Sequence, residues 1–200
     1  MKIAYLARKP IPSMDANSVQ IVKMCEGFAR IGHEVTLFGH RGDAPDCTTF
    51  ERYGVAKGFA LDIFPKRLQL LRKWQFAARL LSHKSVRQAD AFYGRDVLGQ
   101  LAGGSRGKPL ILEAHMLPPE GTLRRRLLGR LFKRPNFSHL VTVTSTLADM
   151  YRVCFPALAD KPIMVAPNAG SEFDATRVIQ GGKGRNPRPQ IGFVGRPFPG

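Results

Sequence analysis

The feature that most limits the fold of this chain is an alternation of short apolar runs with segments of helical periodicity. The run "KIAYLA" at 2–7 predicts a buried strand. From Asn17 onward apolar side chains recur at helical spacing, and "GHEVTLFG" then predicts a glycine stop and a second strand at 34–38. Residues 2–38 therefore predict a βαβ unit, which builds a parallel sheet with right-handed crossovers.

The same alternation continues along the chain. Further strands are predicted at 61–64, 91–94, 110–114, 139–143 and 163–166. Helices are predicted between them, among them a long basic helix at 66–87, a helix at 120–134 and one that starts near Thr146. The pattern predicts an α/β fold: an open, mostly parallel Rossmann-like sheet with helices on both faces.

The composition changes near the end of the chain. Residues 179–190, "IQGGKGRNPRPQ", have the glycine, proline and basic content of a linker. After them "IGFVGRPFPG" at 191–200 predicts a new buried strand, which cannot bury both of its faces alone. We therefore expect a domain at 1–178 and a linker, followed by the first strand of a second domain of a longer protein.

The formal charge of +16 implies an anionic partner, which can be nucleic acid, an acidic membrane surface or a phosphorylated substrate. Nucleic acid is disfavoured because no known binding motif is present. The three cysteines, Cys25, Cys47 and Cys154, are widely spaced and predict reduced thiols rather than a metal site. No apolar run reaches the ~20 residues that span a bilayer, so we expect a cytoplasmic protein.

Two segments concentrate the basic charge. Residues 65–89 hold seven Lys or Arg and 121–135 hold six, without any Asp or Glu. Basic amphipathic helices with Trp or Phe can lie on the anionic inner face of the cell membrane. The alternative is that each helix packs its apolar face on the sheet and exposes the rest to water. The candidate membrane-facing residues are Lys66, Arg67, Arg72, Lys73, Trp74, Arg124, Arg125, Arg126 and Arg130.

Ligands of open α/β sheets bind outside the carboxyl ends of the strands. His115 closes the 110–114 strand, and Glu113, two residues earlier, faces the same side. The imidazole can bond a substrate hydroxyl or support a leaving phosphate, or it can merely satisfy a local carbonyl. Arg95 can hold an anionic group in its planar fork, or it can pair with the adjacent Asp96 or another surface carboxylate.

Other candidates lie at the same predicted rim. Ser145 and Asn168 follow later strands, and Ser145 can instead cap the helix that begins there. The first turn, "SMDANSVQ", lacks GxGxxG, and the chain lacks a P-loop, so a nicotinamide or flavin cofactor is disfavoured. The turn can present free helix N–H groups to the cleft, or serve as a helix cap through Asp15 or Asn17. Its candidate residues are Asp15, Ala16, Asn17 and Ser18.

Five stretches, in order, resemble the amino-terminal domain of a GT-B glycosyltransferase of the large retaining group called glycosyltransferase family four. They are "MKIAYLA…NSVQIVKMCEGFARIGHEVTLFG", "YGRD" with "KPLILEAH", "VTVTSTLADMY", "VAPNAGSEFD" and "IGFVGRPFPG". The resemblance covers nearly the whole chain.

The resemblance implies transfer of a sugar, with retention, from a nucleoside-diphosphate sugar to a glycan or lipid-linked acceptor in cell-surface glycan or glycolipid biosynthesis. It implies neither a metal nor a cofactor, with the acceptor mostly on the first domain and the donor mostly on the second. His115 would contact the transferred sugar, and Arg196 would grip the donor diphosphate. The isolated chain is then expected to be inactive. The alternative is a non-catalytic module of the same fold that binds a membrane or a partner.

Overall fold

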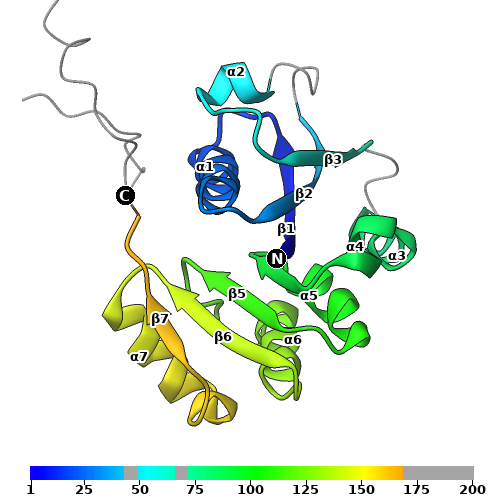
Figure 1. Ribbon diagram of the computed structural model, residues 1–200. Helices are drawn as coiled ribbons and strands as arrows, with labels where there is room; N and C mark the ends of the chain where they lie inside the picture. Colours follow the sequence, from blue (N-terminus) through cyan, green and yellow to red (C-terminus); the bar gives the residue numbers. More distant parts are fainter. Residues whose placement is uncertain (43–48, 66–71, 169–200) are drawn as a thin grey trace, which may run out of the picture. The chain divides into compact units, whose positions relative to one another are not determined.

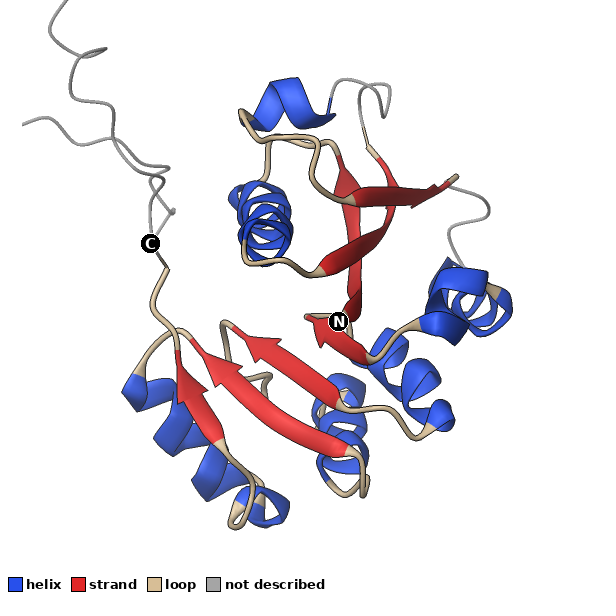
Figure 2. Cartoon of the chain, viewed as in Figure 1, coloured by secondary structure: helices blue, strands red, loops and turns tan. Residues whose placement is uncertain are grey.

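The computed structural model describes residues 1–42, 49–65 and 72–168, and only the backbone for 72–74. Its strands form one parallel sheet in the order β3-β2-β1-β4-β5-β6-β7, with β1 and β4 near the centre (Figures 1 and 2). The strands are β1 (Lys2–Ile11), β2 (Glu34–Arg41), β3 (Ala60–Phe64), β4 (Ala91–Gly94), β5 (Leu110–Ala114), β6 (Phe137–Thr142) and β7 (Ile163–Val165). The predicted fold class, an open parallel α/β sheet, is confirmed.

Helices cover both faces of this sheet (Figure 1). One face packs against α1 (Ala16–Arg30) and α2 (Thr49–Tyr53). The opposite face packs against α3 (Arg72–Ser82), α5 (Val97–Gly103), α6 (Leu123–Phe132) and α7 (Ser145–Cys154). The short helix α4 (Lys84–Gln88) and the 3₁₀ turns η2 (Gly104–Arg106) and η3 (Pro156–Leu158) complete the described elements.

The pleat of β1 explains how one strand serves two cores. Ile3, Tyr5 and Ala7 are buried in the cluster on the α1 side. Ala4 and Leu6 are buried in the cluster on the other side, because successive side chains of a strand point to opposite faces. A strand covered on both faces reads as a continuous apolar run, as "KIAYLA" does.

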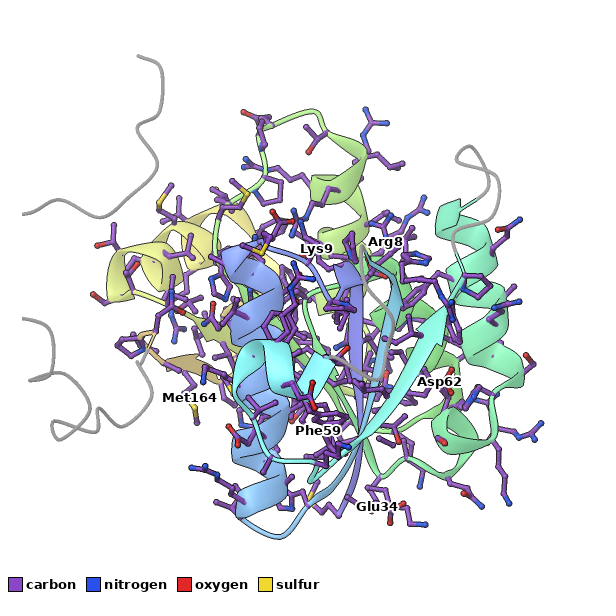
Figure 3. All side chains as sticks on the ribbon, turned by 90° about the horizontal axis from the view of Figure 1, so that it is seen from above. Arg8, Lys9, Glu34, Phe59, Asp62 and Met164 are labelled. Atoms are coloured by element: carbon purple, nitrogen blue, oxygen red, sulfur yellow. The ribbon has the colours of Figure 1, made fainter. Side chains whose placement is uncertain are left out.

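The strand β1 is longer than the predicted 2–7. It continues to Ile11 and, after an irregularity following Leu6, pairs Pro10 with His40 and Ile11 with Arg41 of β2. This extension carries Arg8 and Lys9 to the carboxyl edge of the sheet. Figure 3 shows these two residues at one end of the sheet and Glu34, which begins β2, at the opposite end.

The prediction of one long helix at 66–87 is wrong within the described part. Helix α3 ends at Ser82 and α4 begins at Lys84. Between them His83 is extended, and its Nδ1 accepts the backbone N–H of Ser85 at 3.3 Å, while its Nε2 pairs with Asp62 of β3. The sequence keeps its helical periodicity through this region, but the contact of His83 with Asp62 stabilises a break between the two helices.

Residues Met1–Pro167 form one compact unit. The predicted domain end at 178, the linker at 179–190 and the strand at 191–200 lie outside the described residues and stay predictions. Among the helices of the described ranges, none is long and apolar enough to cross a membrane.

Candidate functional site

A buried carboxylate, Glu113 on β5, organises the polar groups at the carboxyl edge of the sheet. Its side chain is 3% exposed. One oxygen, Oε1, accepts hydrogen bonds from Arg95 Nη2 at 2.7 Å and from His115 Nε2 at 2.6 Å. The other, Oε2, accepts the hydroxyl of Tyr5 at 3.0 Å. The structure therefore brings together the predicted trio of Glu113, His115 and Arg95, and adds Tyr5 from β1.

The environment of Glu113 keeps it ionised. Burial alone would raise the pKa of this carboxyl, but the hydrogen bond from His115 and the charge and hydrogen bond of Arg95 lower the pKa to about 2. Burial and the nearby Glu113 charge raise the pKa values of the Tyr5 and Tyr93 hydroxyls well above their usual range. At neutral pH the cluster holds one negative carboxylate and two neutral phenols.

Arg95 is directed to Glu113 by an unusual backbone at the end of β4. Gly94 has φ +143°, and a Cβ at this position would lie 2.3 Å from the carbonyl oxygen of Leu6. The backbone N–H of Arg95 then donates to that same Leu6 carbonyl at 3.2 Å. The Nη1 atom of Arg95 reaches across to Asn17 Oδ1 on α1 at 3.1 Å. Only glycine fits the turn that places this guanidinium.

The predicted alternative that Arg95 pairs with the neighbouring Asp96 is wrong, because the carboxylate that Arg95 contacts is the buried Glu113. Asp96 caps α5 by accepting the backbone N–H of Gly99 at 2.8 Å. Its other oxygen accepts from Arg8 Nε at 2.8 Å. Strand β1 thus supplies, in Arg8, the cation that pairs with Asp96 in place of Arg95.

A pocket of about 350 Å³ opens over this cluster. Its polar lining includes Arg8, Lys9, Arg95, Arg124, Glu113 and His115. Asn17 and Asp96 also line it, together with apolar side chains from α1, α5, α6 and the loop after β5. The size lies in the range of small-molecule sites, and the lining combines convergent polar groups with an apolar wall.

Of the four candidate residues in the first turn, Asn17 alone lines the pocket. Asp15 stands at the N-cap position of α1 but makes no side-chain cap, and its carbonyl accepts the N–H of Ser18 at 2.9 Å. Ser18 is buried and donates its hydroxyl to the carbonyl of Pro10 at 3.0 Å. Ala16 is exposed. Asp15 thus occupies the predicted N-cap position without a side-chain cap, and Asn17 lies inside α1, where its amide oxygen accepts from Arg95.

The later candidates lie away from this lining or outside the description. Ser145 is exposed and is the first residue of α7, so the cap predicted at Ser145 is wrong. The cap is Thr144, which accepts the N–H of Leu147 at 3.2 Å. Asn168 is exposed and follows β7. Arg196 lies outside the described residues. The site roles of Ser145, Asn168 and Arg196 stay predictions.

The cations of the basic helix α6 are exposed except for Arg125, which is half-buried. Arg124, Arg126 and Arg130 are exposed, whereas Arg125 places its guanidinium 5.8 Å from the centre of the Phe155 ring and donates to the carbonyl of Pro118. Arg125 is therefore not part of an exposed cationic face, contrary to the prediction. Lys66 and Arg67 lie outside the described residues, as do the side chains of Arg72, Lys73 and Trp74.

Three further residues at this site, Tyr5, Arg8 and Lys9, were not among the candidates from the sequence. Tyr5 lies inside an apolar run and gives no polar signal, while Arg8 and Lys9 follow what looks like the end of a strand. The strict alternation of β1 could have placed Tyr5 and Glu113 on one face, but only with the strand order known. No group of three or more His, Cys, Asp or Glu in the described ranges could hold a metal ion.

The comparisons with known proteins agree with the fold. The sequence model of Glycosyltransferase Family 4 matches residues 18–169. The chain belongs to Glycosyltransferase Family 4. The match begins at Ser18 and spans the Arg95 loop and the Glu113–His115 strand end. The resemblance seen in the sequence is thereby confirmed, and a comparison with curated protein sequences found no match.

Solved structures of glycosyltransferases share the fold of this family member. Anabaena Alr3699/HepE, crystallised with UDP and glucose, has a TM-score of 0.59 and 17% identity over 85% of this chain and 45% of its own. Arabidopsis thaliana UGT89C1, crystallised with UDP, has a TM-score of 0.56 and 11% identity over 85% of this chain and 50% of its own. The lipopolysaccharide outer core galactosyltransferase WaaB has a TM-score of 0.50 and 16% identity over 87% of this chain and 47% of its own. The chain spans about half the length of these proteins.

Proposed function

We propose that this chain is the acceptor-binding half of a retaining GT-B glycosyltransferase. The enzyme would move a sugar from a nucleoside-diphosphate sugar to an acceptor in cell-surface glycan or glycolipid biosynthesis. Family membership and the GT-B likeness support the transferase class. The UDP in two of the similar structures supports a nucleotide-sugar donor. We expect the donor to rest mainly on a second domain, with Arg196 on its diphosphate.

The observation that carries the proposal is the imidazole of His115 held by Glu113 at the edge of the pocket. In the neutral imidazole, Nε2 donates to the ionised Glu113 carboxylate and Nδ1 is free to accept a hydrogen bond. A sugar hydroxyl can donate to Nδ1, and this bond orients the transferred sugar. As the diphosphate departs, the positive charge of the nearby Arg95 guanidinium stabilises the negative charge that develops on the diphosphate. This role for cationic side chains needs no metal.

A position at the inner face of the cell membrane fits the same half of the molecule. Exposed Arg124, Arg126 and Arg130 lie on α6, and Leu123 in its first turn is 65% exposed. A helix that presents cations and an apolar side chain together suits an anionic interface. Residues Leu128, Leu131 and Phe132 of α6 are buried, so the same helix also packs on the sheet.

The test compares this chain with a longer product of the same reading frame, using a panel of nucleotide sugars and acceptors. We expect transfer by the longer chain and none by residues 1–200. In the longer chain His115→Ala should lower kcat/KM by about 10²–10⁴-fold. A matched control is His139→Ala on β6, which lies outside the pocket lining. Undiminished kcat/KM in His115→Ala removes the catalytic role, and turnover by the short chain refutes its being an inactive half.

A further inference from the structure

The lining of the pocket at the carboxyl edge carries more positive than negative charge. Its charged side chains are four cations (Arg8, Lys9, Arg95, Arg124) and two carboxylates (Asp96, Glu113). Both carboxylates are already paired, Asp96 with Arg8 and Glu113 with Arg95. Within the described ranges Lys9 and Arg124 form no ion pair. The pocket therefore has two cations whose charge no carboxylate of its lining neutralises.

These two cations come from elements far apart in the chain. Lys9 lies on the extension of β1 and is exposed at the edge of the sheet (Figure 3). Arg124 lies in the first turn of α6, where Thr122 caps the helix by accepting the N–H of Arg125. The fold brings both side chains to one pocket, where their charges can act together on one anionic group.

The remainder of the lining is mainly apolar. Its apolar members are Ile21, Val97, Leu98, Met116, Leu123 and Leu127. Met116 is 62% exposed and Leu123 is 65% exposed, so this wall continues from the pocket to the surface. Apart from the His115 imidazole the lining contains no aromatic ring, so it offers no stacking surface to a nucleobase.

We infer that this pocket binds an amphiphile in which an apolar chain is joined to a phosphate ester. This inference rests on the proposed function in taking that amphiphile as the acceptor. The two unneutralised cations match a phosphate monoester, which carries close to two negative charges at neutral pH. The apolar wall would contact the chain next to the phosphate. A nucleotide sugar has no apolar chain to cover that wall and finds no ring here for its base.

Isothermal titration of the chain with short soluble probes tests the inference. The probes are octyl phosphate, the uncharged octyl glucoside, and inorganic phosphate, which has the charge without the chain. We expect octyl phosphate to bind most tightly. The double variant Lys9→Gln/Arg124→Gln should weaken its binding by about tenfold for each cation removed. Met116→Ser/Leu123→Ser should weaken octyl phosphate and leave inorganic phosphate unchanged.

The control is Lys133→Gln/Arg152→Gln, which removes two exposed cations that lie outside the lining. Its affinity for octyl phosphate should equal that of the unaltered chain. Equal binding of octyl phosphate and octyl glucoside would overturn the inference. Equal weakening by Lys9→Gln/Arg124→Gln and by the control variant would also overturn it, since binding would then follow the overall charge rather than the pocket.

The titration measures no sugar transfer, so its result is separate from that of the proposed function. A longer chain without transferase activity would refute the function and leave the binding result standing. Conversely, an active longer chain whose acceptor KM is unaffected by Lys9→Gln/Arg124→Gln would refute the phosphate ester as the acceptor. A selective rise in the acceptor KM, with the donor KM unchanged, would support it.

Discussion

Replacing the buried Glu113 by glutamine tests the electrostatic reasoning about the site. The substitution keeps the size of the side chain and removes its charge, so Arg95 loses the carboxylate it contacts at 2.7 Å. A pKa lowered from 4.5 to about 2 corresponds to about 3 kcal/mol, because one pKa unit equals about 1.4 kcal/mol. We therefore expect Glu113→Gln to reduce the free energy of unfolding by about 3 kcal/mol at neutral pH.

The same reasoning predicts how this difference depends on pH. The folded carboxyl has the lower pKa, so the unfolded chain takes up the proton first as the pH falls. The stabilisation by Glu113 is then complete above about pH 4.5 and is lost as the pH falls through about 2. Urea unfolding followed by circular dichroism at several pH values measures it. The difference between the unaltered chain and Glu113→Gln should shrink over this interval.

The matched control is Glu34→Gln. Glu34 is exposed and lies 3.6 Å from Lys2, which is also exposed, so its loss should change the free energy of unfolding by less than about 1 kcal/mol. If Glu113→Gln and Glu34→Gln destabilise the chain equally, or if the Glu113→Gln difference is independent of pH, the argument for an ionised buried Glu113 fails.

Two further substitutions test the scaffold around the site. Gly94→Ala should reduce the free energy of unfolding, measured by urea unfolding, by about 3 kcal/mol or more, because the alanine Cβ would lie 2.3 Å from the Leu6 carbonyl oxygen. Gly27 lies in helix α1, and a Cβ at this position would have no neighbouring atom within 4 Å, so Gly27→Ala should stabilise the chain by about 0.5–1 kcal/mol. Similar effects of Gly94→Ala and Gly27→Ala would contradict the steric argument. Phe132→Ala should cost about 3–5 kcal/mol in the same assay, since its buried ring lies 5.0 Å from that of Phe155. A loss below about 1 kcal/mol would show that this aromatic cluster contributes little.

Reading the sequence placed the elements that carry the site. The strands predicted at 91–94 and 110–114 are β4 and β5, and the side shared by Glu113 and His115 follows from the two-residue period of a strand. Such features depend on neighbours within a few residues. Local patterns did not predict the helix break at His83, where a contact with Asp62 of β3 follows the end of α3. They also did not predict that β1 continues past Arg8, because its last residues pair with β2.

The chain by itself determined the alternation of strands and helices, the family, and a carboxylate two residues before a histidine at a strand end. Periodicity and spacing indicate the alternation and the Glu113–His115 pair, because backbone geometry sets both locally, whereas the family follows from the resemblance of five stretches in order. The tertiary structure alone decided the partners. Tyr5 and Glu113 are 108 positions apart in the sequence, and they meet because only β4 lies between β1 and β5 in the sheet. That same strand order gathers Lys9 and Arg124 at one pocket, since distant elements meet only once the sheet has formed.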